Sequence, residues 1–173
     1  LVVGIPRALQ VYDFAPLLIG FLNNLGVKAL LSSATTQEIM ESSVELAYTD
    51  SCLPVKLLYG HAASLKDRCD YILYPCSIRM GLQEGNENQK YSCPLVQASP
   101  FMVKSALGLE GKLLSPILDF SRGDAEAIDN LAAAAVQLGF SKKHGRIAAL
   151  AGLAAERRFE EARLRLGEKI LAE

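Results

Sequence analysis

Three cysteines stand at places in the chain where thiolates could hold a metal ion or an iron–sulfur cluster. Cys52, Cys76 and Cys93 each lie within two residues of a proline, in the sequences Ser-Cys-Leu-Pro, Tyr-Pro-Cys and Ser-Cys-Pro. Each of these prolines stands at the end of a predicted helix or strand. Thiolates are soft ligands that suit zinc and iron–sulfur clusters. If the three loops converge, they would form such a site.

The spacing of the cysteines leaves two interpretations open. The separations do not follow the C-x-x-C pattern of zinc sites or ferredoxins. Each cysteine taken alone fits a small buried hydrophobic residue as well as a ligand. The fourth cysteine, Cys69, sits among Asp67, Arg68 and Asp70 and has no comparable setting, so we exclude it from the predicted site.

Three charged or titratable residues are candidates for groups that surround a cofactor without ligating a metal. Arg7 follows the first predicted strand, where a cation could hold an anionic ligand or neutralise a cluster. Lys56 lies one helical turn after Cys52 and could lower thiolate pKa values, and His61 lies further along the same helix. The alternative for each is an ordinary residue on a solvated helix face or in a surface ion pair.

The sequence reveals no complete catalytic site. Gly4-Ile5-Pro6-Arg7 has a single glycine and lacks both the G-x-G-x-x-G and the G-K-[ST] pattern of phosphate loops. No Ser-His-Asp or Cys-His arrangement can be read either. We therefore assign no catalytic residues, and the sequence leaves open whether the protein is an enzyme.

Composition narrows the class of protein. Half of the 173 residues are hydrophobic and 21% are charged, which is typical of a globular chain with a substantial core. A net charge of −1 gives no reason to expect nucleic acid or an anionic membrane as a partner. The longest apolar stretch, 14–22, contains Pro16 and is shorter than the ~20 residues of a membrane span.

The start of the chain suggests where the protein works. Leu1 leads directly into an apolar run without a charged leader, so we expect a cytoplasmic protein and a piece of a longer chain. In a reducing cytoplasm, clustered cysteines serve metal or redox roles more often than structural disulfides.

Short apolar runs alternate with amphipathic stretches, which predicts an α/β fold, Rossmann-like or flavodoxin-like, with a mostly parallel sheet and flanking helices. Strands are expected at 1–5, 27–31, 71–74, 95–98 and 112–118, the last interrupted by Pro116, and helices at 11–25, 35–44, 54–67 and 100–109. The polar segment 79–91 is expected to be a loop.

The pattern changes after Phe120. An Ala-rich helix is expected at 124–138, and a further helical stretch from 141 onward, interrupted by Gly145 and Gly152. We therefore expect an α/β body over residues 1–120 that carries the cysteine loops. Residues 121–173 would form a helical C-terminal portion leading to a second domain.

Several blocks of the chain, taken together, resemble a known family. The chain is similar to the domain of unknown function in CoA-substrate-specific enzyme activases, which is related to 2-hydroxyacyl-CoA dehydratase subunits. The resemblance runs from Gly4 to about Leu171, and the order of the blocks makes it specific. The blocks are Gly4–Leu9, Asp50–Lys56, Gly60-His61, Tyr74–Cys76, Cys93–Gln97 and Gly167–Leu171.

The resemblance implies an electron-transfer role. In the dehydratase relatives, three cysteines hold a [4Fe–4S] cluster, and an ATP-hydrolysing activator delivers an electron to it. Carried over by position, the metal ligands here would be Cys52, Cys76 and Cys93. The implied partners are an ATPase activator domain or subunit and a CoA thioester substrate. A cluster held by three thiolates is labile, so aerobic purification is expected to remove it.

Two other functions remain open. The chain could be a non-catalytic interaction or scaffold module of the activase, with its cysteines in the core and no metal bound. It could also hold a structural zinc ion, although three ligands would leave the zinc incompletely closed. A homodimer would cover the apolar face of the C-terminal helices, and an additional domain would serve equally.

Overall fold

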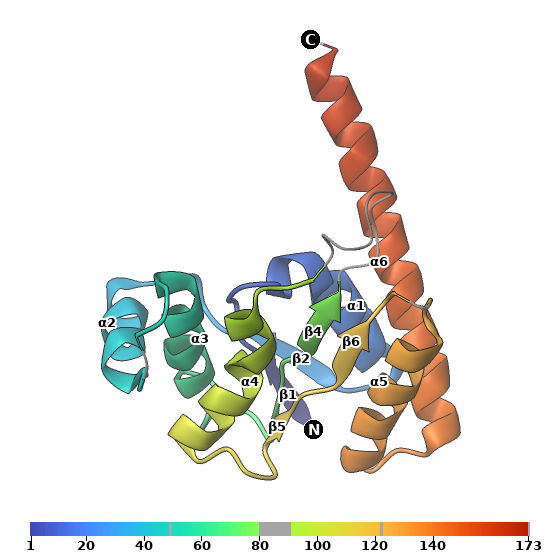
Figure 1. Cartoon of the computed structure of the whole chain (residues 1–173). Helices are drawn as coiled ribbons and strands as arrows, with labels where there is room; N and C mark the ends of the chain where they lie inside the picture. Colours follow the sequence, from blue (N-terminus) through green and yellow to red (C-terminus); the bar gives the residue numbers. More distant parts are fainter. Residues whose placement is uncertain (49, 80–90, 122, 173) are drawn as a thin grey trace.

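The computed structural model describes residues 1–48, 50–79, 91–121 and 123–172. A parallel β-sheet is covered by helices on both faces, as Figure 1 shows. This confirms the predicted α/β fold with a parallel sheet and a helical C-terminal part. Most of the expected loop at 79–91 lies outside the described residues. No helix in the described part of the chain is long and apolar enough to cross a bilayer.

Four strands form the main sheet: β1 (Val2–Ile5), β2 (Lys28–Leu31), β3 (Tyr71–Leu73) and β5 (Leu113–Leu114). They pair in parallel in the order β2-β1-β3-β5. Counted along the chain, this is the order 2-1-3-4 with which flavodoxin-like sheets begin. Because every strand runs the same way, each connection returns through a helix, and the carboxyl ends of the strands gather at one edge.

Two prolines interrupt the neighbouring strands β3 and β5, each of which continues beyond its proline. Pro75 separates β3 from β4 (Cys76–Arg79), and Pro116 separates β5 from β6 (Ile117–Asp119). The pairing continues past both prolines, because the Tyr74 amide donates to the Leu114 carbonyl at 3.0 Å and the Cys76 amide to the Pro116 carbonyl at 3.0 Å. The predicted interruption at Pro116 is therefore correct. A proline has no amide proton to donate to the neighbouring strand. The regular hydrogen bonding between the strands therefore stops at each proline and resumes after it.

Helices α3 (Leu53–Ala63) and α4 (Pro94–Leu107) cover one face of the sheet, and α2 (Gln37–Leu46) packs outside α3 (Figure 1). α2 corresponds to the helix expected at 35–44, and its N-cap is Thr36, whose hydroxyl accepts the Ile39 amide. The core on this face is built from the inward sides of α3, α4 and the sheet, with Leu58, Tyr59, Leu65, Ile72, Val103 and Leu109.

Helices α1 (Val11–Asn24), α5 (Ala125–Gln137) and α6 (Lys142–Leu171) cover the opposite face. Their core is larger and includes Val3, Ile5, Phe14, Leu18, Phe21, Leu73, Leu131, Ala149 and Leu153. α5 and the first half of α6 thus pack into the same core as the strands.

The strand expected at 95–98 is wrong, because these residues form the first turns of α4. The buried positions Ser99, Pro100, Val103 and Leu107 recur every three or four residues, which is helical spacing. Pro94 occupies the first turn, where a missing amide costs nothing. The second proline, Pro100, leaves a carbonyl four residues earlier without its donor. The Ser99 hydroxyl donates to that carbonyl, of Val96, at 2.8 Å.

The interruptions expected at Gly145 and Gly152 are also wrong, because α6 is continuous from Lys142 to Leu171. Both glycines allow close helix packing instead. A Cβ on Gly152 would lie 2.5 Å from the Leu17 carbonyl oxygen of α1, and one on Gly145 would lie 2.7 Å from the Ala135 Cβ of α5. After Glu156, the last buried residue of α6, the helix leaves the body and extends to the C-terminus (Figure 1).

We predict that Gly152→Ala destabilises the protein while Gly167→Ala does not. The added methyl group at Gly152 would press on α1, and such overpacking costs ~1–3 kcal/mol. Gly167 lies in the same helix with no atom within 4 Å of its Cβ position, so alanine there adds ~1 kcal/mol of helix propensity at most. Urea unfolding of both variants measures the two effects. Equal midpoints would show that the α1–α6 contact is not tight.

We predict a second effect from the buried carboxyl group of Glu156. Burial raises its pKa from 4.5 to about 7, so the folded protein holds this proton more tightly than the unfolded chain. The stability it contributes is present below pH 4.5 and is lost as the pH rises through about 7. Glu156→Gln should therefore gain stability relative to the natural protein across this range, on the order of 3 kcal/mol.

Urea unfolding at several pH values measures this gain, with the exposed Glu45 changed to Gln as the control. A difference that does not change with pH would contradict the raised pKa.

Candidate functional site

The carboxyl edge of the sheet, toward which the strand arrows point, is at the top of Figure 1. The predicted cysteines lie at the starts of α3, β4 and α4. Cys52 is the N-cap of α3, as expected from its position ahead of Leu53-Pro54, and its side chain is exposed. It makes no capping hydrogen bond. Its carbonyl accepts the amides of Val55 at 3.0 Å and Lys56 at 3.1 Å, which start the helix.

Cys93 occupies the matching position on α4. The sequence predicted that it enters a strand, but it is the N-cap of the helix, exposed and without a capping hydrogen bond. Both helices therefore begin with an exposed thiol beside uncapped backbone amides. A helix N-terminus attracts negative charge, so both helix starts suit an anionic group.

Cys76 lies next to the first turn of α4. It opens β4, is 3% exposed, and its thiol donates to the Gln97 carbonyl at 3.2 Å. The Gln97 amide in turn donates to the Cys93 carbonyl at 3.0 Å. The fold thus connects Cys76 and Cys93 through one helical turn. Burial raises the pKa of the Cys76 thiol.

The structure does not assemble the three thiols into a ready-made metal site. No group of three or more His, Cys, Asp or Glu side chains in the described residues could hold a metal ion. Cys69 lies elsewhere: its sulfur donates to the Leu65 carbonyl at 3.1 Å. A Cβ on Gly4 would lie 2.8 Å from that sulfur, so Cys69 packs beneath β1. Burial is the main cause that raises its pKa.

His61 is buried and has hydrogen-bond partners at both ring nitrogens, so it is not an exposed ligand. Its Nδ1 lies 2.9 Å from the Ser32 hydroxyl and its Nε2 lies 3.1 Å from the Thr35 hydroxyl, and the side chain is 0% exposed. Burial, and then the charge of Arg7, lower its pKa, which keeps the ring neutral. The Arg7 amide donates to the same Ser32 hydroxyl at 2.9 Å. This network ties the end of β1 to the end of β2 and to α3.

Lys56 and Arg7 supply positive charge at the same edge. Lys56 lies one turn into α3, with its ammonium 4.0 Å from Asp50, and Arg7 is half-buried after β1. Both cations belong to segments that end or begin at the carboxyl edge, as the sequence predicted.

The loop after β1 holds a strained residue that the sequence did not indicate. Leu9 has a φ of 53°, a left-handed conformation that a branched side chain avoids. Next to it, the Gln10 amide group donates to the Ser92 hydroxyl at 2.7 Å, which attaches the loop to the residue before Cys93. Strain of this kind persists where surrounding contacts hold it, and it is frequent near functional sites.

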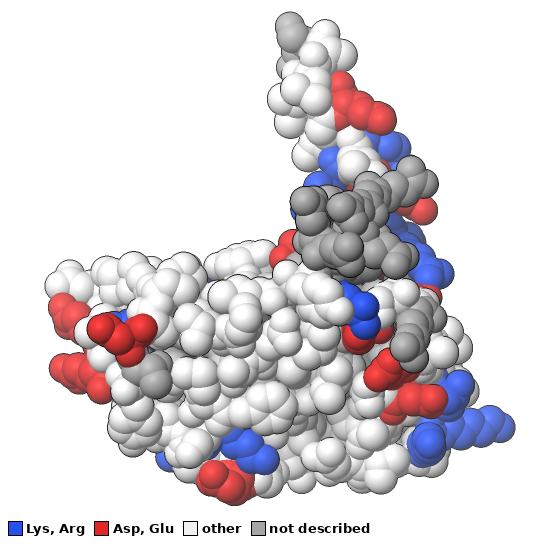
Figure 2. All heavy atoms as spheres, in the orientation of Figure 1, with Lys and Arg blue, Asp and Glu red and all other residues white. Residues whose placement is uncertain are grey.

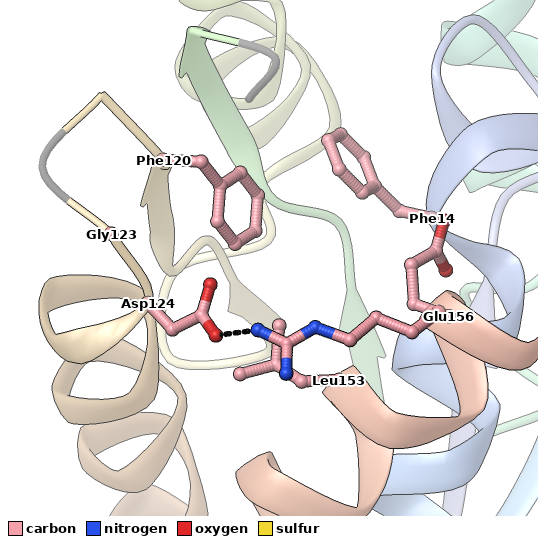
Figure 3. Close-up of a pocket in the computed structure, with 7 residues that line it drawn as sticks. Phe14, Phe120, Gly123, Asp124, Leu153 and Glu156 are labelled. Carbon is pink, nitrogen blue, oxygen red and sulfur yellow. Dashed lines mark hydrogen bonds and ion pairs between the residues drawn. The ribbon is translucent and has the colours of Figure 1, made fainter. Parts of the chain in front are cut away.

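A cavity on the face of the sheet that α1, α5 and α6 cover was also not predicted. It lies between α1, α6 and the start of α5, and Figure 3 shows the side chains of Phe14, Phe120 and Glu156 in its wall. A signal was present in the sequence: Glu156 continues the three- and four-residue spacing of Gly145, Ala149, Gly152 and Leu153. An acidic residue on an otherwise apolar helix face marks a buried carboxyl group.

Charged side chains avoid the middle of the face shown in Figure 2. Acidic side chains gather on α2, and charges of both signs are mixed along α6 and around the lower rim. On this face, no large patch of one sign suggests a polyanionic partner.

Comparison with known proteins identifies the family. A family model described as the CoA enzyme activase uncharacterised domain matches residues 2–173, almost the whole chain. No curated protein and no solved structure matches. The chain belongs to the family of CoA enzyme activase uncharacterised domains.

Proposed function

We propose that this domain binds a [4Fe–4S] cluster through Cys52, Cys76 and Cys93 and serves electron transfer within a CoA enzyme activase. An ATPase activator domain or subunit would deliver the electron, and a CoA thioester would be the substrate of the whole system. The domain itself is not assigned a complete active site. A cluster of this kind requires a reducing compartment, so the proposal includes a cytoplasmic location.

One observation carries the proposal. Cys52 and Cys93 occupy equivalent positions, each an exposed N-cap of a helix that starts at the carboxyl edge. Cys76 is bonded to the first turn of the helix that Cys93 caps. Ligands bind at this edge in open α/β sheets, and Cys69 is not part of the arrangement.

The three cysteine thiols are groups of the chemical type that binds an iron–sulfur cluster. Three thiolates are the expected ligands of a [4Fe–4S] cluster with one open iron, and uncapped helix amides can hydrogen-bond to sulfur and stabilise a reduced cluster. When bound, the cluster would supply one-electron chemistry at low potential. The sulfurs are not held in a ready-made group, so loading would draw the two exposed thiols to the buried one.

The surrounding residues have separate roles in this proposal. Arg7 and Lys56 would offset the negative charge of the cluster and its thiolates. His61 would act indirectly, because both ring nitrogens already have hydroxyl partners. It would hold the loop after β1 and the N-terminal part of α3 in place.

We predict that anaerobic reconstitution with iron and sulfide gives a brown protein with one cluster. Cys52→Ser, Cys76→Ser and Cys93→Ser should each lose most of the bound iron, because serine is a poor ligand for these clusters. Cys69→Ser is the matched control and should retain the iron of the natural protein. Iron and sulfide analysis with visible absorption spectra measures the result.

The opposite pattern would overturn the ligand assignment. If Cys69→Ser abolishes the cluster and Cys76→Ser leaves it intact, the three residues named here are not the ligands. Stoichiometric zinc after ordinary aerobic purification would support the structural zinc site instead.

A second candidate function is a non-catalytic interaction module. The observation that favours it is the free end of α6, where apolar side chains are exposed beyond the body: Phe159, Leu164, Leu166, Ile170 and Leu171. In that case, protein purified and reconstituted without oxygen would stay colourless and take up no iron.

A further inference from the structure

A cavity of about 230 Å³ lies on the face of the sheet opposite α3 and α4, apart from the three cysteines. Its apolar walls come from Phe14 of α1, Phe120 after β6 and Leu153 of α6. The two phenyl rings have centroids 6.1 Å apart and are tilted by 32°. An apolar cavity of ~150 Å³ is enough to bind benzene. This cavity therefore has room for a ligand with one ring, but not for a drug-sized molecule.

A buried carboxyl group forms part of the wall. Glu156 is 3% exposed, and its Oε2 accepts the Leu17 amide of α1 at 3.0 Å. Pro16 precedes this amide and disturbs the regular hydrogen bonding of α1. The other oxygen, Oε1, is buried and has no hydrogen-bond partner in the structure. A buried polar atom without a partner is costly, so a ligand that donates to Oε1 would remove a penalty.

The charges around Glu156 are mostly negative. Asp13 of α1 and Glu160 of α6 raise its pKa, and Arg163 of α6 lowers it. At the rim, Arg157 forms an ion pair with Asp124, the N-cap of α5 (Figure 3). Because Arg157 is already paired with Asp124, the surroundings favour a cation over an anion. The faces of the phenyl rings also attract cations.

We propose that this cavity binds a small organic cation, with a primary ammonium or amidinium group on an apolar body of about one ring. The ammonium group would donate to Glu156, and the ring would pack against the cavity wall formed by Phe14, Phe120 and Leu153. The inference does not depend on the cysteine site, and a failure of either proposal leaves the other standing.

Benzylammonium is the probe, and isothermal titration of the 173-residue protein measures its affinity from pH 5.5 to 8.5. The carboxyl group must lose its proton to pair with the cation. Affinity should therefore fall by up to about tenfold for each pH unit below about 7 and stay constant above it. At pH 8, benzylammonium should bind more tightly than the neutral benzyl alcohol.

Two variants test the contact itself. Glu156→Gln keeps an acceptor for the Leu17 amide but loses the charge, so it should weaken benzylammonium binding by about tenfold or more and remove the pH dependence. The exposed Glu45, on α2 and remote from the cavity, provides the matched control: Glu45→Gln should leave the affinity unchanged. Circular dichroism verifies that both variants are folded.

Three results would overturn the proposal. The first is no detectable binding of benzylammonium at pH 8 to the folded protein. The second is an affinity for benzyl alcohol that equals or exceeds the affinity for benzylammonium. That result would make the cavity an apolar site without charge recognition. The third is an affinity that Glu156→Gln leaves unchanged.

Discussion

The parallel pairing of β1, β2, β3 and β5 is the constraint on which the rest of the structure depends. Parallel strands cannot be joined by tight turns, so each connection crosses a face of the sheet as a helix. Every such helix must begin at the edge where the strands end. The N-termini of α3 and α4 therefore share the carboxyl edge, and their N-caps, Cys52 and Cys93, share it with them. The continuation of β3 through Pro75 into β4 places Cys76 beside the same turn of α4.

The opposite face depends on small side chains. Gly152 and Gly145 let α6 approach α1 and α5 more closely than any side chain would allow. This close approach lets Glu156 reach an amide of α1 beside Pro16. The contact also fixes the point where α6 leaves the body, since nothing beyond Glu156 is buried in the described part of the helix. One face of the sheet thus carries the cysteine-bearing helices, and the other carries the small cavity and the projecting helix.

Most of the fold could be predicted from the sequence because the apolar periodicity is strong and local. The strand at 2–5 and the helices at 11–24 and 37–46 were readable in this way. The segment 95–98 was misread because a short, mostly apolar stretch fits a buried strand as well as the first turn of a helix. A side-chain hydroxyl that compensates for Pro100 is not visible in a sequence. Gly145 and Gly152 were misread as helix breaks because their partners lie on helices distant in sequence.

The site was predictable in its residue types and only partly in its geometry. Pro54, two residues after Cys52, marked the helix start there, but the helix start at Cys93 was misread as the entry to a strand. The hydrogen bond from Cys76 to α4 depends on tertiary packing. The central claim is that these three thiols share one cluster. Anomalous diffraction at the iron edge, from anaerobic crystals of reconstituted protein, tests it most directly. The account predicts one iron peak contacting the sulfurs of Cys52, Cys76 and Cys93. Iron bound at Cys69, or no ordered iron in protein that retains its colour, would contradict it.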